Sequence, residues 1–196
     1  APRASRGQSR GGQARGGKLT FLAFIVKAVI EALKLHPTFN AMLDDEEDEI
    51  VVKKYYNIGI AVDVPDGLIV PVVKSADEKS IFDIAADIQR LAQAAKERTL
   101  DLADVKGGTF SITNVGAIGG YAATPIINYP EVAILATMKI EDRPRAAGGA
   151  VVVRKTLPLC LAFDHRVNDG AEAARFTKDL IAFLESPEKL PLSGAA

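Results

Sequence analysis

Residues 161–170 read LAFDHRVNDG, and this stretch decides the fold class that we expect for the chain. An apolar, strand-forming run ends at Phe163, and a polar turn over Asp164 to Asn168 follows it. An amphipathic helix is expected directly afterwards, over Ala171 to Leu184. Proteins that pack helices against a sheet typically join a strand to a helix in this way, and the connecting loops are where catalytic side chains concentrate.

The rest of the chain predicts the other parts of the same architecture. Residues 19–35 are apolar almost all round, which indicates a helix buried between layers, and Pro37 marks its end. Ser80 and Asp83 form a capping-box pattern that opens a second helix over Ile81 to Lys96. We expect strands at 40–43, 50–52, 56–64, 68–73, 109–115, 132–140 and 150–163. A sheet with segregated helices predicts an α+β fold in two layers.

Length and composition place the chain among ordinary folded domains. It has 196 residues, of which 48% are hydrophobic and 25% charged, so it is not wholly disordered. One cysteine excludes an intrachain disulfide and a multi-cysteine zinc site, and two histidines exclude a histidine-rich metal centre. We therefore expect no metal. Charged residues interrupt the apolar stretch at 19–35, so we expect no membrane span.

Charge is spread unevenly along the chain. Residues 1–18 carry five basic side chains and no acidic one, so the remaining residues sum to −6. The basic segment contains no aromatic residue that could stack on a base, and we expect no nucleic-acid partner. We expect residues 1–17 to be a flexible Gly/Arg-rich linker or tail and residues 18–196 to form the folded domain. The single cysteine and the lack of a signal predict a prokaryotic cytoplasm, with the mitochondrial matrix as the alternative.

His165 is the strongest candidate for chemistry. A histidine titrates near neutral pH and can take a proton from an oxygen or sulfur nucleophile, and a nearby carboxylate can orient it. In the alternative interpretation Asp169 caps the helix and Asp164 pairs with Arg166. That alternative accounts for the acids but not for the histidine, and the residues alone leave both open.

A second candidate is the segment 107–116, GGTFSITNVG. Ser111 and Thr113 lie two apart on a strand and share a face, so either hydroxyl could donate a hydrogen bond to a developing oxyanion. On sequence chemistry alone, the interpretation as ordinary strand-forming residues is favoured. We expect Cys160 to be a buried, inert thiol and His36 to be structural. The acidic run 44–49 is expected to be a solvated hairpin tip.

Four blocks of the chain together resemble one family. They read KYYNIGIAVDVPDGLIVPVVK, GGTFSITNVGAIGG, TPIINYPEVAIL and LPLCLAFDHRVNDG. In this order they are similar to the catalytic domain of the dihydrolipoamide acyltransferases, the core components of 2-oxoacid dehydrogenase complexes. The last block carries a DHRxxDG signature. The resemblance runs from about Lys18 to Leu192, with a further strand and helix expected before it, so the catalytic domain is expected to be N-terminally incomplete.

The resemblance implies a fold, a reaction and three site residues. The fold is that of chloramphenicol acetyltransferase, a mixed sheet with helices that assembles as trimers. The reaction is acyl transfer between dihydrolipoamide and coenzyme A, both substrates, with the lipoyl group carried on a separate domain. His165 matches the general base, Asp169 the supporting aspartate, and Thr113 the oxyanion-stabilising hydroxyl contributed by the neighbouring subunit. No coenzyme A-binding residue is assigned.

The resemblance also implies partners. Trimers would join into a core of about 24 or about 60 subunits, as cubic and icosahedral symmetry allow, and bind the decarboxylase and dihydrolipoamide dehydrogenase components. Leu190 and Leu192 have no evident place in the protomer core, so we expect this end to dock against a neighbouring trimer. Two alternatives remain: an assembly scaffold with little activity, and a chloramphenicol acetyltransferase-like enzyme.

Overall fold

The computed structural model describes residues 19–194 and begins with the expected buried helix. Helix α1 (Phe21–Leu35) buries nine of its positions, including Lys27 at 1% exposure, because apolar residues surround it on most sides. The helix ends at His36, and Pro37 starts a single 3-10 turn, η1 (Pro37–Phe39). This turn lies beside the C-terminal helix α4 (Gly170–Glu185).

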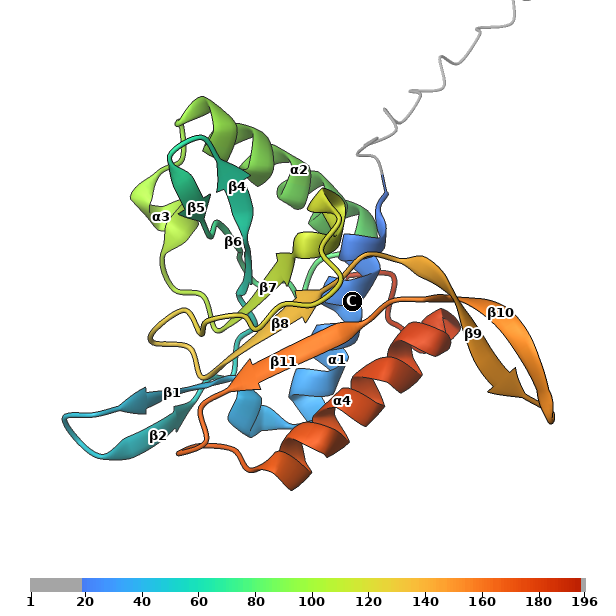
Figure 1. Cartoon of the computed structure of the whole chain (residues 1–196). Coiled ribbons are helices and arrows are strands. Elements are labelled where there is room, and N and C mark those ends of the chain that lie inside the picture. The colour runs from blue at the N-terminus through green and yellow to red at the C-terminus, as the bar shows by residue number, and fades with distance from the viewer. Residues whose placement is uncertain (1–18, 195–196) are drawn as a thin grey trace, which may run out of the picture.

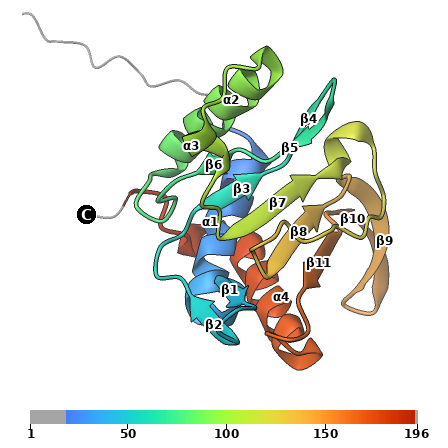
Figure 2. The same ribbon diagram turned by 90° about the vertical axis from the view of Figure 1, so that its left-hand side faces the viewer.

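A mixed five-stranded sheet forms the other layer, in the order β11–β8–β7–β3–β6. The central strands β3 (Ile58–Ile60), β7 (Phe110–Asn114) and β8 (Ala133–Thr137) are parallel, and the edge strands β6 (Val72–Val73) and β11 (Leu159–Phe163) run antiparallel to their neighbours. Helices α1 and α4 lie side by side against one face of this sheet (Figures 1 and 2). The expected two-layer α+β fold is confirmed.

Three phenylalanines join the two layers. Phe39, Phe110 and Phe176 are each fully buried, and the Phe39 and Phe176 rings lie 4.7 Å apart between their centroids. Phe110 belongs to β7, and its side chain points toward the helices. Side chains alternate between the two faces of a strand, so Ile112 points the same way as Phe110. Ser111 and Thr113 therefore share the opposite face of the sheet.

Several expected strands are divided in the structure. The run 56–64 becomes β3 and β4 (Val62–Val64), and the run 68–73 becomes β5 (Gly67–Ile69) and β6. Strands β4 and β5 form a hairpin with its turn at Pro65 and Asp66, and this hairpin is separate from the main sheet. Pro71 has no N–H to donate at this point, and its carbonyl accepts from Ile60 N instead.

The expected strand 150–163 is wrong as one continuous element. It divides into β10 (Ala150–Thr156) and β11 around Pro158. Strand β10 pairs with β9 (Glu141–Ala147), which the sequence analysis missed because its residues are charged and exposed. This hairpin extends away from the body of the molecule (Figure 1). The acidic run is confirmed as the tip of a second hairpin, β1 (Ala41–Asp44) with β2 (Glu49–Val52).

The remaining helix matches its prediction, and three other features differ from what the sequence predicts. The capping box at Ser80 is present and α2 spans Ile81–Glu97, whereas the short α3 (Leu102–Val105) was not expected. Leu190 is 5% exposed and belongs to the protomer's own core, contrary to expectation, while Leu192 is 41% exposed. Cys160 is half-buried rather than enclosed, since β11 is an edge strand.

The expectation of a linker or tail concerns residues 1–17, which lie outside the described residues. From residue 19 to residue 194, no helix is both long and apolar enough to cross a membrane.

Candidate active site

His165 lies in a tight turn between β11 and α4. The amide of Asp164 donates to the carbonyl of Val132 at 2.8 Å, which ties the start of the turn to β8. The amides of Val167 and Asn168 then both donate to the carbonyl of Asp164, at 3.1 and 3.0 Å. The His165 side chain is exposed, and its ring lies 5.8 Å from that of Phe163. The turn therefore presents an accessible imidazole at the end of a strand.

Asp169 begins α4 beside this histidine. Its side chain accepts a hydrogen bond from the amide of Glu172 at 2.8 Å, so it is the N-cap of the helix. That backbone hydrogen bond, followed by those of Ala171 and by the charges of Arg175 and His165, lowers the pKa of Asp169. The carboxylate is thus held ionised next to the imidazole. The helix-capping role of Asp169 is therefore compatible with the expected role beside His165, because the capping carboxylate stays ionised.

Arg166 makes the expected pair with Asp164 and a second pair that was not expected. Its Nη2 lies 2.7 Å from Asp164 Oδ2, and its Nη1 lies 2.9 Å from Asp45 Oδ1. Hydrogen bonding to Arg166 is the main reason why the pKa of Asp164 is lowered. Asp45 belongs to the acidic hairpin tip, so this hairpin lies against the histidine turn.

The structure does not bring Thr113 and His165 together within one chain. Thr113 pairs with Ala136 of β8, and Ala136 pairs with Cys160 of β11. Thr113 is therefore level with Cys160, while His165 follows the far end of β11. At about 3.3 Å per residue and about 4.8 Å between strands, Thr113 lies roughly 10 Å along and roughly 10 Å across the sheet from the end of β11. A protomer carries the two groups at separate places.

Ser111 is fully buried, so it cannot reach a substrate, whereas Thr113 is half-buried near the end of its strand. Ser111 lies instead against Glu131, a buried carboxyl that the sequence analysis missed. Burial raises the pKa of Glu131 to about 7, although the nearby Ser111 side chain and a hydrogen bond from Asn128 act to lower it. No local pattern marks this glutamate, because Gly108 and Ser111, which lie against it, are distant in the sequence.

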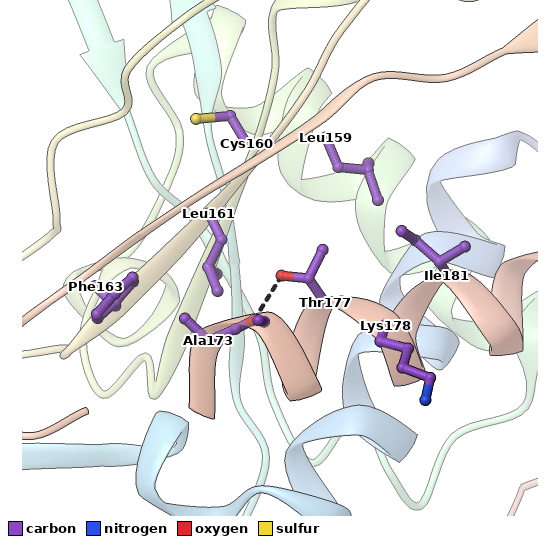
Figure 3. A pocket seen from close by; sticks show the side chains of 9 residues that line it. Leu159, Cys160, Leu161, Phe163, Ala173, Thr177, Lys178 and Ile181 are labelled. Carbon is purple, nitrogen blue, oxygen red and sulfur yellow. Dashed lines mark hydrogen bonds between the residues drawn. The ribbon is translucent and has the colours of Figure 1, made fainter. Parts of the chain in front are cut away.

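A cavity of about 600 Å³ lies between β11 and α4, and none of the three predicted site residues lines it. Figure 3 shows its apolar lining, with Leu161 and Phe163 from the strand facing Ala173 and Ile181 from the helix. Ile181 is 40% exposed at this cavity. In residues 19–194, no three His, Cys, Asp or Glu side chains cluster closely enough to hold a metal ion.

The arrangement of sheet and helices first defines a fold class. A chloramphenicol acetyltransferase matches 84% of the chain with a TM-score of 0.54 at 17% identity, a likeness that shows the fold alone. Residues 3–192 match the family model described as 2-oxoacid dehydrogenases acyltransferase (catalytic domain). The chain belongs to this family, which confirms the resemblance drawn from its four sequence blocks.

Two curated relatives are dihydrolipoyllysine-residue acetyltransferase components of pyruvate dehydrogenase complexes. The protein of Acholeplasma laidlawii is 46% identical over 189 residues, which are 96% of this chain and 35% of that protein. The protein of Bacillus subtilis is 45% identical over 174 residues, 89% of this chain and 39% of that protein. The chain therefore spans between a third and two fifths of these relatives' length.

Solved structures agree with the family. The dihydrolipoamide acetyltransferase of Azotobacter vinelandii superimposes with a TM-score of 0.86 at 44% identity, over 88% of this chain and 71% of that one. Work on that enzyme addresses a serine, a histidine and an asparagine in its catalytic mechanism. The cubic core of a pyruvate dehydrogenase multienzyme complex gives a TM-score of 0.84 at 46% identity, over 86% of this chain and 70% of that one.

Proposed function

We propose that this chain transfers an acetyl group between dihydrolipoamide and coenzyme A, at a site that two subunits of a trimer share. The separation of His165 from Thr113 within the protomer carries this proposal. The base His165 has no Thr113 beside it in its own chain, and Thr113 has no His165 beside it. In the proposed trimer, a neighbouring copy supplies the missing residue to each. The acetyl group is chosen because the curated relatives described above are named acetyltransferases.

The chemistry follows from the exposed imidazole. A neutral nitrogen of His165 takes the proton of the attacking thiol, which is mostly protonated at neutral pH. The thiolate attacks the thioester carbonyl carbon, and the carbonyl oxygen becomes negative. The carbon–sulfur bond of the departing thiol then breaks, and the His165 imidazolium returns the proton to that sulfur. Asp169 stabilises the imidazolium between these two steps because its lowered pKa keeps it negative.

The Thr113 hydroxyl of the neighbouring subunit donates a hydrogen bond to the oxyanion. Such a contact forms chiefly in the transition state, and losing it costs about 10²- to 10³-fold in kcat. Thr113→Val keeps the shape and removes the hydroxyl, and we expect that loss. Thr113→Ser keeps the hydroxyl, and we expect near-normal turnover.

Mixing two inactive variants tests the shared site directly. His165→Ala and Thr113→Val are each assembled alone and then unfolded and reassembled together. In random mixed trimers about a quarter of the sites combine an intact His165 from one chain with an intact Thr113 from the next, because each three-fold interface is the same. Recovery of about a quarter of the parent activity is the expected result. A mixture that stays as inactive as its components would overturn the shared site.

A second role, as the structural core of a complex, is favoured by the likeness to the cubic pyruvate dehydrogenase core. In this proposal trimers assemble into a large particle that binds decarboxylase and dihydrolipoamide dehydrogenase components. An inactive scaffold is the alternative, and a large particle without transferase activity would establish it. We also propose a prokaryotic cytoplasmic location, supported by bacterial relatives, with the mitochondrial matrix as the alternative that fractionation of the source cells would detect.

A further inference from the structure

One buried side chain in the histidine turn has no part in the proposed reaction. Asn168 lies three residues after His165, and it is 4% exposed although His165 and Asp169 are exposed. Its Oδ1 accepts a hydrogen bond from Thr38 Oγ1 at 2.5 Å, and its Nδ2 donates to the carbonyl of Thr38 at 3.2 Å. A single residue of η1 thus satisfies both ends of the amide. Leaving either end unpaired would be unfavourable in a buried place.

The segment that holds Asn168 is itself anchored. His36 lies between two carboxylates of α4, with Nδ1 2.6 Å from Glu172 and Nε2 2.8 Å from Asp179. The segment that follows α1 therefore contacts the chain on both sides of Asp169. Thr38 contacts Asn168, which precedes Asp169, and His36 contacts Glu172, which follows it. These contacts fix η1 relative to the first turns of α4.

The imidazole of His165 depends on this support. Across residues 19–194, no side-chain hydrogen bond to the His165 ring is found, so the position of the ring depends chiefly on the backbone of the turn and on the contact with Phe163. Two amide hydrogen bonds to the carbonyl of Asp164 shape the turn, and the Asn168 side chain attaches it to the body. A displacement of about 1 Å in a catalytic group can lower the rate on the order of 100-fold.

We propose that Thr38 and Asn168 are positioning residues: their paired hydrogen bonds hold the turn so that His165 reaches the thiol. This inference rests on the proposed acyl transfer. It adds two residues to the site that touch no substrate themselves, and one of them lies 127 positions before His165 in the chain.

Hydroxyl-to-methyl substitutions test the proposal. Thr38→Val removes the hydroxyl that donates to Asn168, and Thr38→Ser restores it. Thr177→Val is the matched control, because Thr177 Oγ1 donates to Ala173 O at 2.8 Å within α4 and away from the turn. We expect Thr38→Val to lower kcat ten- to a hundredfold with both KM values within about twofold of the parent. Thr38→Ser and Thr177→Val should keep the parent kcat at comparable melting temperatures.

Amide exchange gives a readout that does not need activity. Val167 and Asn168 amides, both bonded to Asp164 O, should exchange faster in Thr38→Val but not in Thr177→Val. Parent-like kcat in Thr38→Val, an equal loss in Thr177→Val, or unchanged exchange at these amides would each overturn the positioning role. A parent chain that assembles but transfers no acyl group overturns the proposed function instead, and the exchange result still decides the role of Thr38.

Discussion

At the scale of single residues, one short turn places the exposed imidazole of His165 beside the ionised carboxylate of Asp169, the base and its support in the proposed reaction. The turn projects the imidazole from the end of an edge strand, while the first turn of α4 holds the Asp169 carboxylate ionised through its free amides. The charge of Arg175 in the same helix also helps to keep this carboxylate ionised. What the arrangement lacks is a donor for the oxyanion, and the proposed trimer supplies that donor.

Replacing His165 tests the proposed base. His165→Ala should lower acyl transfer by roughly 10²- to 10⁴-fold, the contribution typical of a general base. The exposed ring makes few contacts, so the melting temperature should stay within a few degrees of the parent. Steady-state kinetics on folded, assembled protein measure the effect, and turnover close to that of the parent would remove His165 from the mechanism.

Glu131 makes stability depend on pH. Burial raises the pKa of its carboxyl to about 7, above the ordinary value of 4.5, so the folded state holds the proton more tightly than the unfolded chain does. The resulting stabilisation is complete below about pH 4.5 and is lost as pH rises toward 7. Between pH 5 and pH 8 the loss is on the order of 3 kcal/mol.

Glu131→Gln removes this titration and keeps the size of the side chain. We expect the variant's free energy of unfolding, from urea titrations, to fall less than the parent's between pH 5 and pH 8. Above pH 7 the variant should be the more stable of the two. Parallel pH profiles for parent and variant would show that Glu131 does not titrate in this range.

At the scale of elements, His36 joins the end of α1 to α4. Burial alone would lower its pKa, but hydrogen bonds to Glu172 and Asp179 outweigh burial and leave the pKa raised above 6.5. The protonated ring can donate from both nitrogens, one to each carboxylate. The pKa of Glu172 is lowered chiefly by this contact with His36. The tie is therefore fully formed below pH 6.5 and weakens as pH rises through the folded-state pKa.

His36→Gln tests this tie. Hydrogen bonds to charged groups contribute about 2 kcal/mol, so the variant should be less stable than the parent by about that amount at pH 5.5. The difference should shrink at pH 9, because deprotonation of His36 becomes more complete as pH rises and leaves the ring only one N–H to donate. Chemical denaturation at both pH values measures it. A destabilisation that is equal at the two pH values would mean that packing against Phe176, not charge, is what the substitution removes.

The elements also show where sequence patterns succeed. Helices α1, α2 and α4 follow their apolar periodicity and caps to within two residues, since both are local properties. The predicted strands are too long, because β propensity carries no information on where the hydrogen-bonded partner strand ends. Strand β9 was missed since its exposed, charged residues carry no apolar alternation, and only its pairing with β10 makes it a strand.

At the scale of the whole molecule, the corrected place of Leu190 changes the account of assembly. Leu190 packs into its own protomer, so deleting residues 190–196 would damage the core as well as any contact between trimers. Leu192 keeps an exposed side chain, and its carbonyl accepts from the Ile81 amide, which holds the segment against α2. Of the two leucines, Leu192 is therefore the one left exposed for the proposed contact with a neighbouring trimer.

Leu192→Asp should separate the two levels of assembly. A charge buried at a contact between trimers is strongly unfavourable, so we expect active trimers that no longer form the large particle. Leu102→Asp, which changes an exposed leucine of α3, is the control and should leave the particle intact. Light scattering together with the transferase assay measures both levels. A full-size particle from Leu192→Asp would exclude this contact.

The sequence by itself determined the family, the α+β class, the helices and the turn that carries His165 and Asp169, because signature residues and caps act over a few positions. Only the tertiary structure decided that Thr113 lies far from His165, that Glu131 is buried beside Ser111, and that Thr38 holds Asn168. Each of these depends on strand register or on the packing of α1 against α4, which bring together residues far apart in the chain. Side-chain type is a local property, but the neighbours that give it a role are set by the fold.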